Sequence, residues 1–364
     1  MPAVAAERPH LFDLDPAAVQ AWCSERSLPK FAASQILDWV YAKGVGDSAA
    51  MSNLSKAARA ALSEGMTFVR GRPLRHQLAT DGTQKILMGW PDEGEVLPMA
   101  EPSRQTECVM IPTDDRRTAC ISSQVGCPVG CRFCASGIGG LDGNLTAGQI
   151  VEQVWHLSRL EGVGRISNIV FMGMGEPLAN YNAVTAAIRT LHAPWGFGIS
   201  ARRITVSTVG LPAAIRKFCS FELPVTLALS LHAPFDDLRR EIIPWAEYST
   251  IAELLEACQE WFDRTGREIT LEYILLGRVN DRAEHAHELA RLARTLRANV
   301  NLIRYNEVQG MPYERPSSDD VLAFQEILRS KGVNVHIRAS RGRDIAAACG
   351  QLRHESLRRD QSAA

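Results

Sequence analysis

The stretch "GCPVGCRFCASG", residues 126–137, places three cysteines, Cys127, Cys131 and Cys134, within eight positions of the chain. A structural zinc site usually needs four protein ligands, commonly as two CxxC or CxxH pairs, and this sequence contains no second pair. A cubane iron-sulfur cluster usually takes four thiolates, so three cysteines leave one iron open to a substrate or cofactor. The spacing CxxxCxxC, with an aromatic residue before the third cysteine, therefore predicts a [4Fe-4S] cluster.

The cysteine motif follows the first of a series of predicted strands that alternate with helices. Such alternation, with helices of ten or more residues, indicates right-handed βαβ units and a parallel sheet. About six repeats predict a partial (β/α)6 barrel of the α/β class, whose active site lies at the carboxyl ends of the strands. The expected strands are 118–124, 166–172, 203–207, 225–231, 268–275, 300–305 and 333–338, and the expected helices are 146–160, one after 180, 211–219, 249–264, 281–297 and 318–330.

The chain before the barrel divides into two parts. Residues 1–67 show helical periodicity and predict a small helical accessory domain. Residues 68–112 read as short strands separated by turn signals and predict a short β connector. We expect the partial barrel over residues 113–345, followed by a C-terminal segment and basic tail over 346–364.

The composition is that of a globular protein. Of its 364 residues 46% are hydrophobic, and 40 Lys and Arg balance 41 Asp and Glu, so net charge does not indicate a nucleic-acid partner. The N-terminus lacks a basic region followed by an apolar run, and no stretch reaches the roughly 20 apolar residues of a membrane span. Nine cysteines, an odd number, argue against a disulfide-stapled secreted scaffold. We therefore expect a cytoplasmic protein that does not enter a membrane.

Small polar residues follow several of the predicted strands. The segment "FMGMGEP", residues 171–177, combines a glycine-rich turn, which lets a ligand approach the backbone, with a carboxylate that can accept from an ammonium group. The alternative is an ordinary turn that starts a helix, and at each later strand end the alternative is a locally satisfied side chain. Because four strand ends carry such groups toward one rim, we interpret them as one binding site. The candidates are Gly175, Glu176, Ser207, Ser230, Leu231, His232 and Asn306.

The cysteine motif and the glycine-rich turn together resemble the radical S-adenosylmethionine (radical SAM) superfamily. The resemblance implies that Cys127, Cys131 and Cys134 hold the [4Fe-4S] cluster and that the amino and carboxylate groups of S-adenosyl-L-methionine (SAM) bind its fourth iron. It also implies that Gly175 and Glu176 contact the amino group of SAM, and it makes the later strand ends SAM contacts. Reduction of the cluster would then cleave SAM to a 5′-deoxyadenosyl radical.

Two further cysteines narrow the resemblance. Cys120 lies in "DDRRTACISSQVGC", residues 114–127, and Cys349 lies in "SRGRDIAAACGQL", residues 340–352. Both segments closely resemble the RlmN/Cfr family of radical SAM RNA methyltransferases. The family methylates carbon 2 or carbon 8 of an adenosine in the peptidyl-transferase centre of 23S rRNA, and in some bacteria also the adenosine next to the anticodon of tRNA. The segments "SRGRDI" and "ERPS" favour the carbon-2 branch, although Arg343 stands where the family usually has a small or acidic residue.

The family resemblance also implies a role for each unusual residue. One SAM methylates the Cys349 thiolate, and a second SAM supplies the radical that converts the S-methyl group into a methylene radical, which adds to the adenine. Glu107, in "TECVMIP", is the implied base that removes the carbon-2 proton. Cys120 is the implied resolving thiol, which forms a disulfide with Cys349 and releases the RNA.

The partners implied are 23S rRNA in an assembling, protein-poor large subunit, tRNA in some bacteria, and an electron donor such as flavodoxin. RNA contacts are expected from the helical N-terminal domain and from local basic clusters. Two alternatives remain open from the sequence: a methyltransferase acting at carbon 8, and a non-enzymatic iron-sulfur RNA-binding redox protein in which Cys120 and Cys349 form a switch disulfide. The basic clusters are Arg70, Arg72 and Arg75, then Arg202 and Arg203, and finally Arg338, Arg341, Arg343, Arg353, Arg358 and Arg359.

Overall fold

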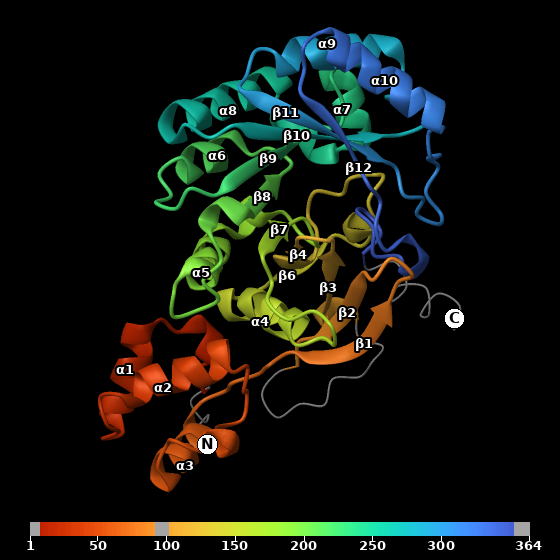
Figure 1. The fold of residues 1–364 in the computed structure, drawn as a ribbon. Coiled ribbons are helices and arrows are strands. Elements are labelled where there is room, and N and C mark those ends of the chain that lie inside the picture. The colour runs from red at the N-terminus through yellow and green to blue at the C-terminus, as the bar shows by residue number, and fades with distance from the viewer. Residues whose placement is uncertain (1–7, 92–101, 353–364) are drawn as a thin grey trace, which may run out of the picture.

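A computed structural model describes residues 8–91 and 102–352 (Figure 1). In residues 8–91 three short α-helices pack together at one end of the molecule, where side chains of Asp15 and Ser55 cap α1 and α3 by accepting backbone hydrogen bonds. Nowhere in the two described ranges is a helix long and apolar enough to cross a membrane. The helices are α1 (Pro16–Glu25), α2 (Ala32–Leu37) and α3 (Lys56–Gly65), with short 3-10 or π segments at Leu11–Asp13, Asp38–Ala42 and Ser48–Ala50.

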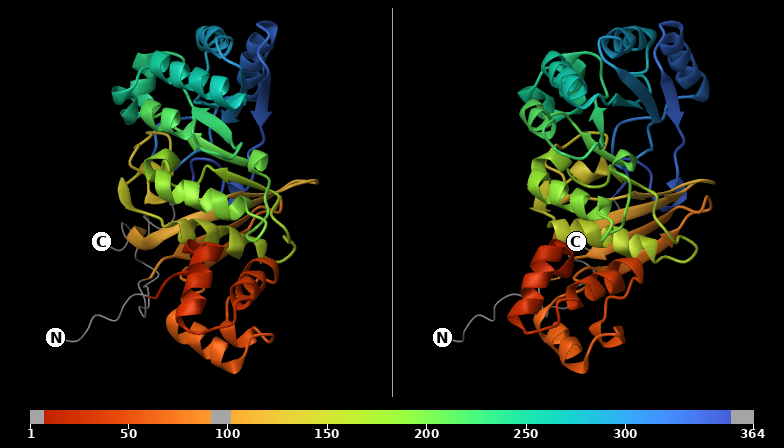
Figure 2. Two further views of the ribbon diagram at one scale, coloured as in Figure 1. Left: turned by 90° about the vertical axis from the view of Figure 1, so that its left-hand side faces the viewer. Right: turned by 60° about the vertical axis from the view of Figure 1, so that its left-hand side comes forward.

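Ten strands of the described chain form one curved sheet in the order β1-β2-β3-β4-β7-β8-β9-β10-β11-β12. From β4 onward all neighbours are parallel, and the helices cover the outer face of this part (Figure 2). The strands of the parallel part are β4 (Arg117–Cys120), β7 (Asn168–Phe171), β8 (Ile204–Thr208), β9 (Thr226–Ser230), β10 (Ile269–Leu275), β11 (Ala298–Arg304) and β12 (Val335–Arg338). The helices are α4 (Ala147–Ser158), α5 (Tyr181–His192), α6 (Pro212–Phe218), α7 (Asp236–Ile242), α8 (Ile251–Thr265), α9 (Ala283–Ala293) and α10 (Ser318–Ser330).

This arrangement is the α/β partial barrel that the sequence predicts, with two local differences. Helix α7 was not expected, and the predicted strand 118–124 is interrupted after Cys120. The interruption arises because the backbone N–H of Ser122 bonds to the Gln153 side chain (2.8 Å) instead of a neighbouring strand. The chain then turns into a separate hairpin of β5 (Gln124–Gly126) and β6 (Leu141–Asn144), which brackets the cysteine motif.

The segment expected as a β connector is part of the barrel's own sheet. Strands β1 (Arg72–Leu78), β2 (Gln84–Gly89) and β3 (Gln105–Pro112) extend it with antiparallel pairing. Across these strands Lys85 is opposite Val109, and Val109 is opposite Cys120. Residues in such register share one face of a sheet, and apolar residues of the C-terminal segment, Ile345, Ala347 and Leu352, cluster with Val109 and Cys120.

A buried carboxylate joins the helical unit to the barrel. Glu152 of α4 is fully buried and lies 3.1 Å from His10 and 3.2 Å from His156. Its oxygens also accept hydrogen bonds from the backbone N–H groups of Arg70 (3.1 Å) and Gly71 (2.7 Å). Burial acts to lower the pKa of His10, but its contacts with Asp13 and Glu152 raise it; burial acts to raise the pKa of Glu152, but its contacts with His10 and His156 lower it. The ion pair therefore fixes the position of the N-terminal helices relative to the barrel.

Candidate active site

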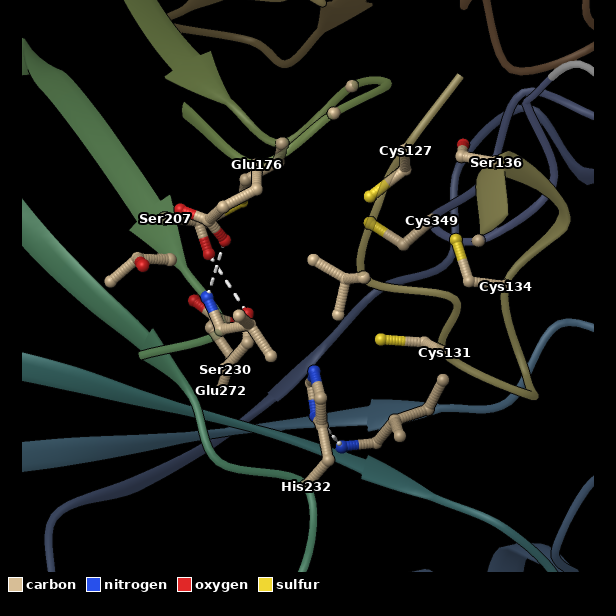
Figure 3. A pocket seen from close by; sticks show the side chains of 18 of the residues that line it. Cys127, Cys131, Cys134, Ser136, Glu176, Ser207, Ser230, His232, Glu272 and Cys349 are labelled. Atoms are coloured by element: carbon tan, nitrogen blue, oxygen red, sulfur yellow. Dashed lines mark hydrogen bonds between the residues drawn. The ribbon is translucent and has the colours of Figure 1, made fainter. Parts of the chain in front are cut away.

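The three motif cysteines line one cavity at the carboxyl ends of the parallel strands, which we call the cysteine cavity. Figure 3 shows the sulfur atoms of Cys127 and Cys131 directed into the same space as Glu176 and Ser207. The loop that carries the cysteines is tightly folded, because a Cβ on Gly137 would lie 3.0 Å from the Cα of Gly130. A side chain at position 137 would therefore press on the Gly130 backbone and strain the closed loop.

The donor set of this cavity fits an iron-sulfur cluster better than a single metal ion. In the described ranges no three His, Cys, Asp or Glu side chains are close enough to hold one ion, whereas a cubane cluster uses one thiolate for each of several separate irons. Burial raises the pKa of all three thiols, that of Cys127 to about 12. Because a metal ligand must be a thiolate, a cluster bound here would have to displace the protons of these three thiols.

Glu176 closes the cavity opposite the cysteines. It is buried, its Oε2 accepts a hydrogen bond from the Val209 N–H (2.8 Å), and its Oε1 accepts one from Leu178 (3.0 Å). Burial raises the pKa of this carboxyl to about 7, although these hydrogen bonds act in the opposite direction. The neighbouring Gly175 has φ +101° and a Cβ there would lie 2.7 Å from the Ser123 Oγ, so glycine is required.

The next two strand ends contribute a hydroxyl pair and a neutral imidazole. Ser207 and Ser230 line the cavity, and their Oγ atoms lie 3.1 Å apart. His232 also lines the cavity, with φ +60°, and its Nδ1 accepts a hydrogen bond from the Ile274 N–H (3.0 Å). Burial lowers the pKa of His232 to about 3, so the ring is uncharged and supplies shape and a polar edge rather than charge.

Two of the predicted SAM contacts, Leu231 and Asn306, are not in the lining of the cysteine cavity and stay predictions. Leu231 is fully buried in the main core, and its N–H bonds to the backbone oxygen of Glu272 (3.0 Å). Asn306 lines a second, adjoining cavity, where its Nδ2 donates to the Cys349 carbonyl (3.3 Å). Neither residue is among those that line the cysteine cavity.

Cys349 lies between the two cavities. It lines both, together with Met172, Ile303 and Arg338. The segment that carries it is held against the cysteine loop, because the Gly350 carbonyl accepts a hydrogen bond from the N–H of Ala135 (2.7 Å). The sulfur of Cys349 points into the cysteine cavity in Figure 3.

Cys120 lines the second cavity, so the fold brings this cysteine and Cys349 together from distant parts of the chain. Burial raises the pKa of Cys120 to about 12, and the nearby Cys349 acts in the same direction while Arg338 opposes it. Among the basic residues named from the sequence, Arg338 and Arg341 line this cavity, whereas Arg353, Arg358 and Arg359 lie outside the described residues.

Glu107 is buried beside the second cavity rather than in its lining. Its carboxylate lies 2.9 Å from the Nζ of Lys85, and its backbone oxygen accepts a hydrogen bond from the Ser122 Oγ (2.7 Å). Glu107 lies two residues before Val109 in β3, and Val109 is opposite Cys120. Glu107 therefore lies on the same face of the sheet as Cys120. Through Lys85, which also bonds to the Ala346 carbonyl, Glu107 is linked to the segment that carries Cys349.

Comparisons with known proteins agree with this site. Residues 121–293 match the model of the radical SAM superfamily, and residues 9–67 match that of the ribosomal RNA large subunit methyltransferase N-terminal domain. A "Probable dual-specificity RNA methyltransferase RlmN" from Rhodopirellula baltica is 43% identical over 94% of this chain and 90% of the relative. One of the same description from Synechococcus sp. (strain CC9902) is 45% identical over 94% of this chain and 95% of the relative.

The chain belongs to the RlmN family of radical SAM RNA methyltransferases. The crystal structure of a radical SAM methyltransferase from Sphaerobacter thermophilus is also similar, with a TM-score of 0.89 and 42% identity over 95% of this chain and 99% of that one. These comparisons confirm the family resemblance and the partial-barrel fold predicted from the sequence. They also confirm the cofactors of the family, a [4Fe-4S] cluster and SAM.

Sequence reasoning gave no role to Lys85 and treated Arg338 as a phosphate contact. In the structure Arg338 ends β12, donates a hydrogen bond to the Met172 sulfur (3.3 Å) and lines both cavities. Cys349 raises the pKa of this arginine, as does Glu272, and burial opposes both. A lysine in the apolar stretch "KILMGW" is the one signal that could have drawn attention to position 85.

Proposed function

We propose that this protein methylates carbon 2 of an adenosine in 23S rRNA, and the adenosine next to the anticodon in tRNA, with Cys349 as the methyl carrier. The relatives named above are described as dual-specificity RNA methyltransferases. The observation that carries the proposal is the place of Cys349, which lines both the cysteine cavity and the cavity of Cys120. A methyl group on this sulfur would be reached by the cofactors in the cysteine cavity. It could then be transferred to an RNA base in the second cavity.

The chemistry of adenine explains the need for such a carrier. Carbon 2 is an electron-poor aromatic carbon, so it does not attack the methyl group of SAM as a thiolate does. When bound by Cys127, Cys131 and Cys134, the cluster with SAM would supply the radical that activates a methyl group on Cys349. Glu176, Ser207 and Ser230 line the wall opposite these cysteines, where they would orient SAM by its ammonium group and its hydroxyls.

The chain's own residues then complete the transfer. Cys349 first accepts a methyl group on sulfur, since a thiolate is a good nucleophile for a sulfonium methyl. Glu107 takes the proton from carbon 2 after the carbon–carbon bond has formed. One electron must also leave the radical adduct, and the cluster, when bound, would accept it. Cys120, as a thiolate, then attacks the sulfur of Cys349; the bond from that sulfur to the new carbon breaks with its electron pair going to the carbon, which takes up a proton to become a methyl group, and a disulfide remains. A thiol reductant must open this disulfide before the next cycle.

RNA binding is assigned to two surfaces. The helical unit, which matches the N-terminal domain model over residues 9–67, would grip folded RNA. Arg116 and Arg341, both at the second cavity, would contact phosphates near the target base. We place the reaction in the cytoplasm, on a protein-poor assembling large subunit, with a flavodoxin-type protein as the electron donor.

Nucleoside mass spectrometry tests the proposal. Ribosomal and transfer RNA from cells that lack the gene are incubated with the reconstituted protein, SAM and dithionite. We expect 2-methyladenosine in both RNAs, and none from the Cys349→Ala variant. Appearance of 8-methyladenosine instead would assign the protein to the other branch of the family, and absence of 5′-deoxyadenosine would indicate a redox protein without this activity.

A further inference from the structure

The hairpin of β1 and β2 is hydrogen-bonded to the segment that carries Cys349. The Thr80 N–H donates to the Asp344 side chain (2.9 Å), and the Gly342 N–H donates to the Asp81 side chain (3.0 Å). A third contact comes from Lys85, whose Nζ donates to the Ala346 carbonyl (3.0 Å). Figure 1 shows this hairpin alongside the end of the C-terminal segment. The hairpin thus determines where residues 342–346 lie.

The contact from Lys85 differs from the other two because it is buried and charged. The side chain of Lys85 is only 2% exposed, and its Nζ also lies 2.9 Å from the Glu107 carboxylate, which is 7% exposed. A buried ammonium is retained in a protein only where it is paired and hydrogen-bonded. Both conditions are met here by two groups that belong to different functional elements, the proposed base and the segment of Cys349.

The geometry of the sheet brings these elements to one place. Lys85, Val109 and Cys120 lie in one row across β2, β3 and β4, and Glu107 shares their face. Ala346 has φ +50°, an uncommon conformation for a residue with a side chain. In this conformation the carbonyl of Ala346, three residues before Cys349, accepts the hydrogen bond from Lys85.

We propose that Lys85 is a positioning residue for the proton-transfer step. Its ammonium, bonded to both the Glu107 carboxylate and the Ala346 carbonyl, holds that carboxylate at a fixed place relative to the segment of Cys349. In the step itself the carbon-2 proton leaves the RNA adduct as H⁺ and adds to the Glu107 carboxylate, which becomes a neutral acid, and Lys85 keeps its own proton. This inference rests on the function proposed above, and it concerns one step of that reaction.

A merely structural ion pair would behave differently from a positioning residue. Loss of a structural pair disturbs the fold and lowers every step together. Loss of a positioning residue spares the steps before proton transfer, namely SAM cleavage and S-methylation of Cys349, and blocks the step after them. The RNA then stays joined to Cys349, because the crosslink is resolved only after the carbon-2 proton is removed.

The experiment compares Lys85→Met, whose side chain is also long and unbranched, with the wild type and with Asp344→Ala. The Asp344 variant removes a contact between hairpin and segment but leaves the ion pair of Lys85 and Glu107 in place. Each reconstituted protein is assayed for 5′-deoxyadenosine, for methyl on Cys349, for methylated RNA, and for RNA covalently attached to protein.

We expect Lys85→Met to form 5′-deoxyadenosine and methylcysteine within about threefold of wild type, to lose methylated RNA about 100-fold, as for removal of a general base, and to accumulate the crosslink. Asp344→Ala should not accumulate it. Full RNA methylation by Lys85→Met, or equal loss of all four signals, would overturn the inference. Failure of the proposed function is distinguishable, because the wild-type protein itself would then make no methylcysteine.

A double variant tests the coupling of Lys85 to Glu107 even if the single substitution also weakens folding. If Lys85 acts through Glu107, adding Lys85→Met to Glu107→Gln should reduce RNA methylation by no more than about twofold beyond Glu107→Gln alone, since coupled residues are not additive. Additive losses in this cycle would show that Lys85 does not act through the carboxylate and would contradict the proposal.

Discussion

The burial of Glu176 predicts that SAM binding depends on pH near neutrality. In the proposed function the Glu176 carboxylate must be ionised to pair with the SAM ammonium group, and burial raises its pKa to about 7. For such a group the fraction that is ionised is about one tenth at pH 6 and about nine tenths at pH 8. The affinity for SAM is therefore lost as the pH falls through 7. We therefore expect the Kd for SAM to be about tenfold higher at pH 6 than at pH 8.

Calorimetric titration of SAM into the cluster-loaded protein between pH 6 and pH 8 measures this effect. The matched control is Glu176→Gln, which keeps the shape of the side chain and part of its hydrogen bonding to Leu178 and Val209. The control should bind more weakly than wild type at pH 8, with little change down to pH 6. A wild-type affinity that is constant over this range, or a control with the same slope as wild type, would refute the role of the carboxylate.

Three further substitutions are predicted from the structure. Cys120→Ala should leave SAM cleavage intact but trap RNA on the protein, and purified variant free of covalent RNA would exclude the resolving role. Gly137→Ala should lower the iron content of anaerobically purified protein, since its Cβ would meet the Gly130 backbone at 3.0 Å. Glu152→Gln should lower the free energy of unfolding by about 3–5 kcal/mol, as for breaking a buried ion pair, measured by denaturant unfolding. An unchanged midpoint would show that Glu152 and His10 do not fix the helical unit.

The elements that the sequence predicted well are those with local signals. The spacing of Cys127, Cys131 and Cys134 and the alternation of strands and helices depend on neighbouring residues, and the structure shows both. Packing across the sheet has no such signal. The sequence did not indicate that β1 to β3 continue the barrel's sheet, because strand pairing is set by tertiary contacts.

The same limit explains why the surroundings of individual site residues could not be predicted. Leu231 and Asn306 follow predicted strands as Ser207 and Ser230 do, but the structure puts one in the core and the other at the second cavity. The end of a strand predicts that a residue lies near the rim of the barrel. The conformation of the following turn determines which way its side chain points. The pairing of Lys85 with Glu107 depends on the register of two strands, which is not encoded in either one alone.

The central claim, that Cys349 carries the methyl group, is tested most directly by following a label. The protein is supplied with SAM whose methyl group carries deuterium in place of hydrogen, and both the Cys349 peptide and the RNA nucleosides are analysed by mass spectrometry. The account predicts a fully deuterated methyl on Cys349, and then a methyl on adenine that has exchanged one deuterium for hydrogen. Methylated RNA from a protein whose Cys349 is never labelled, or an adenine methyl that keeps every deuterium, would contradict it.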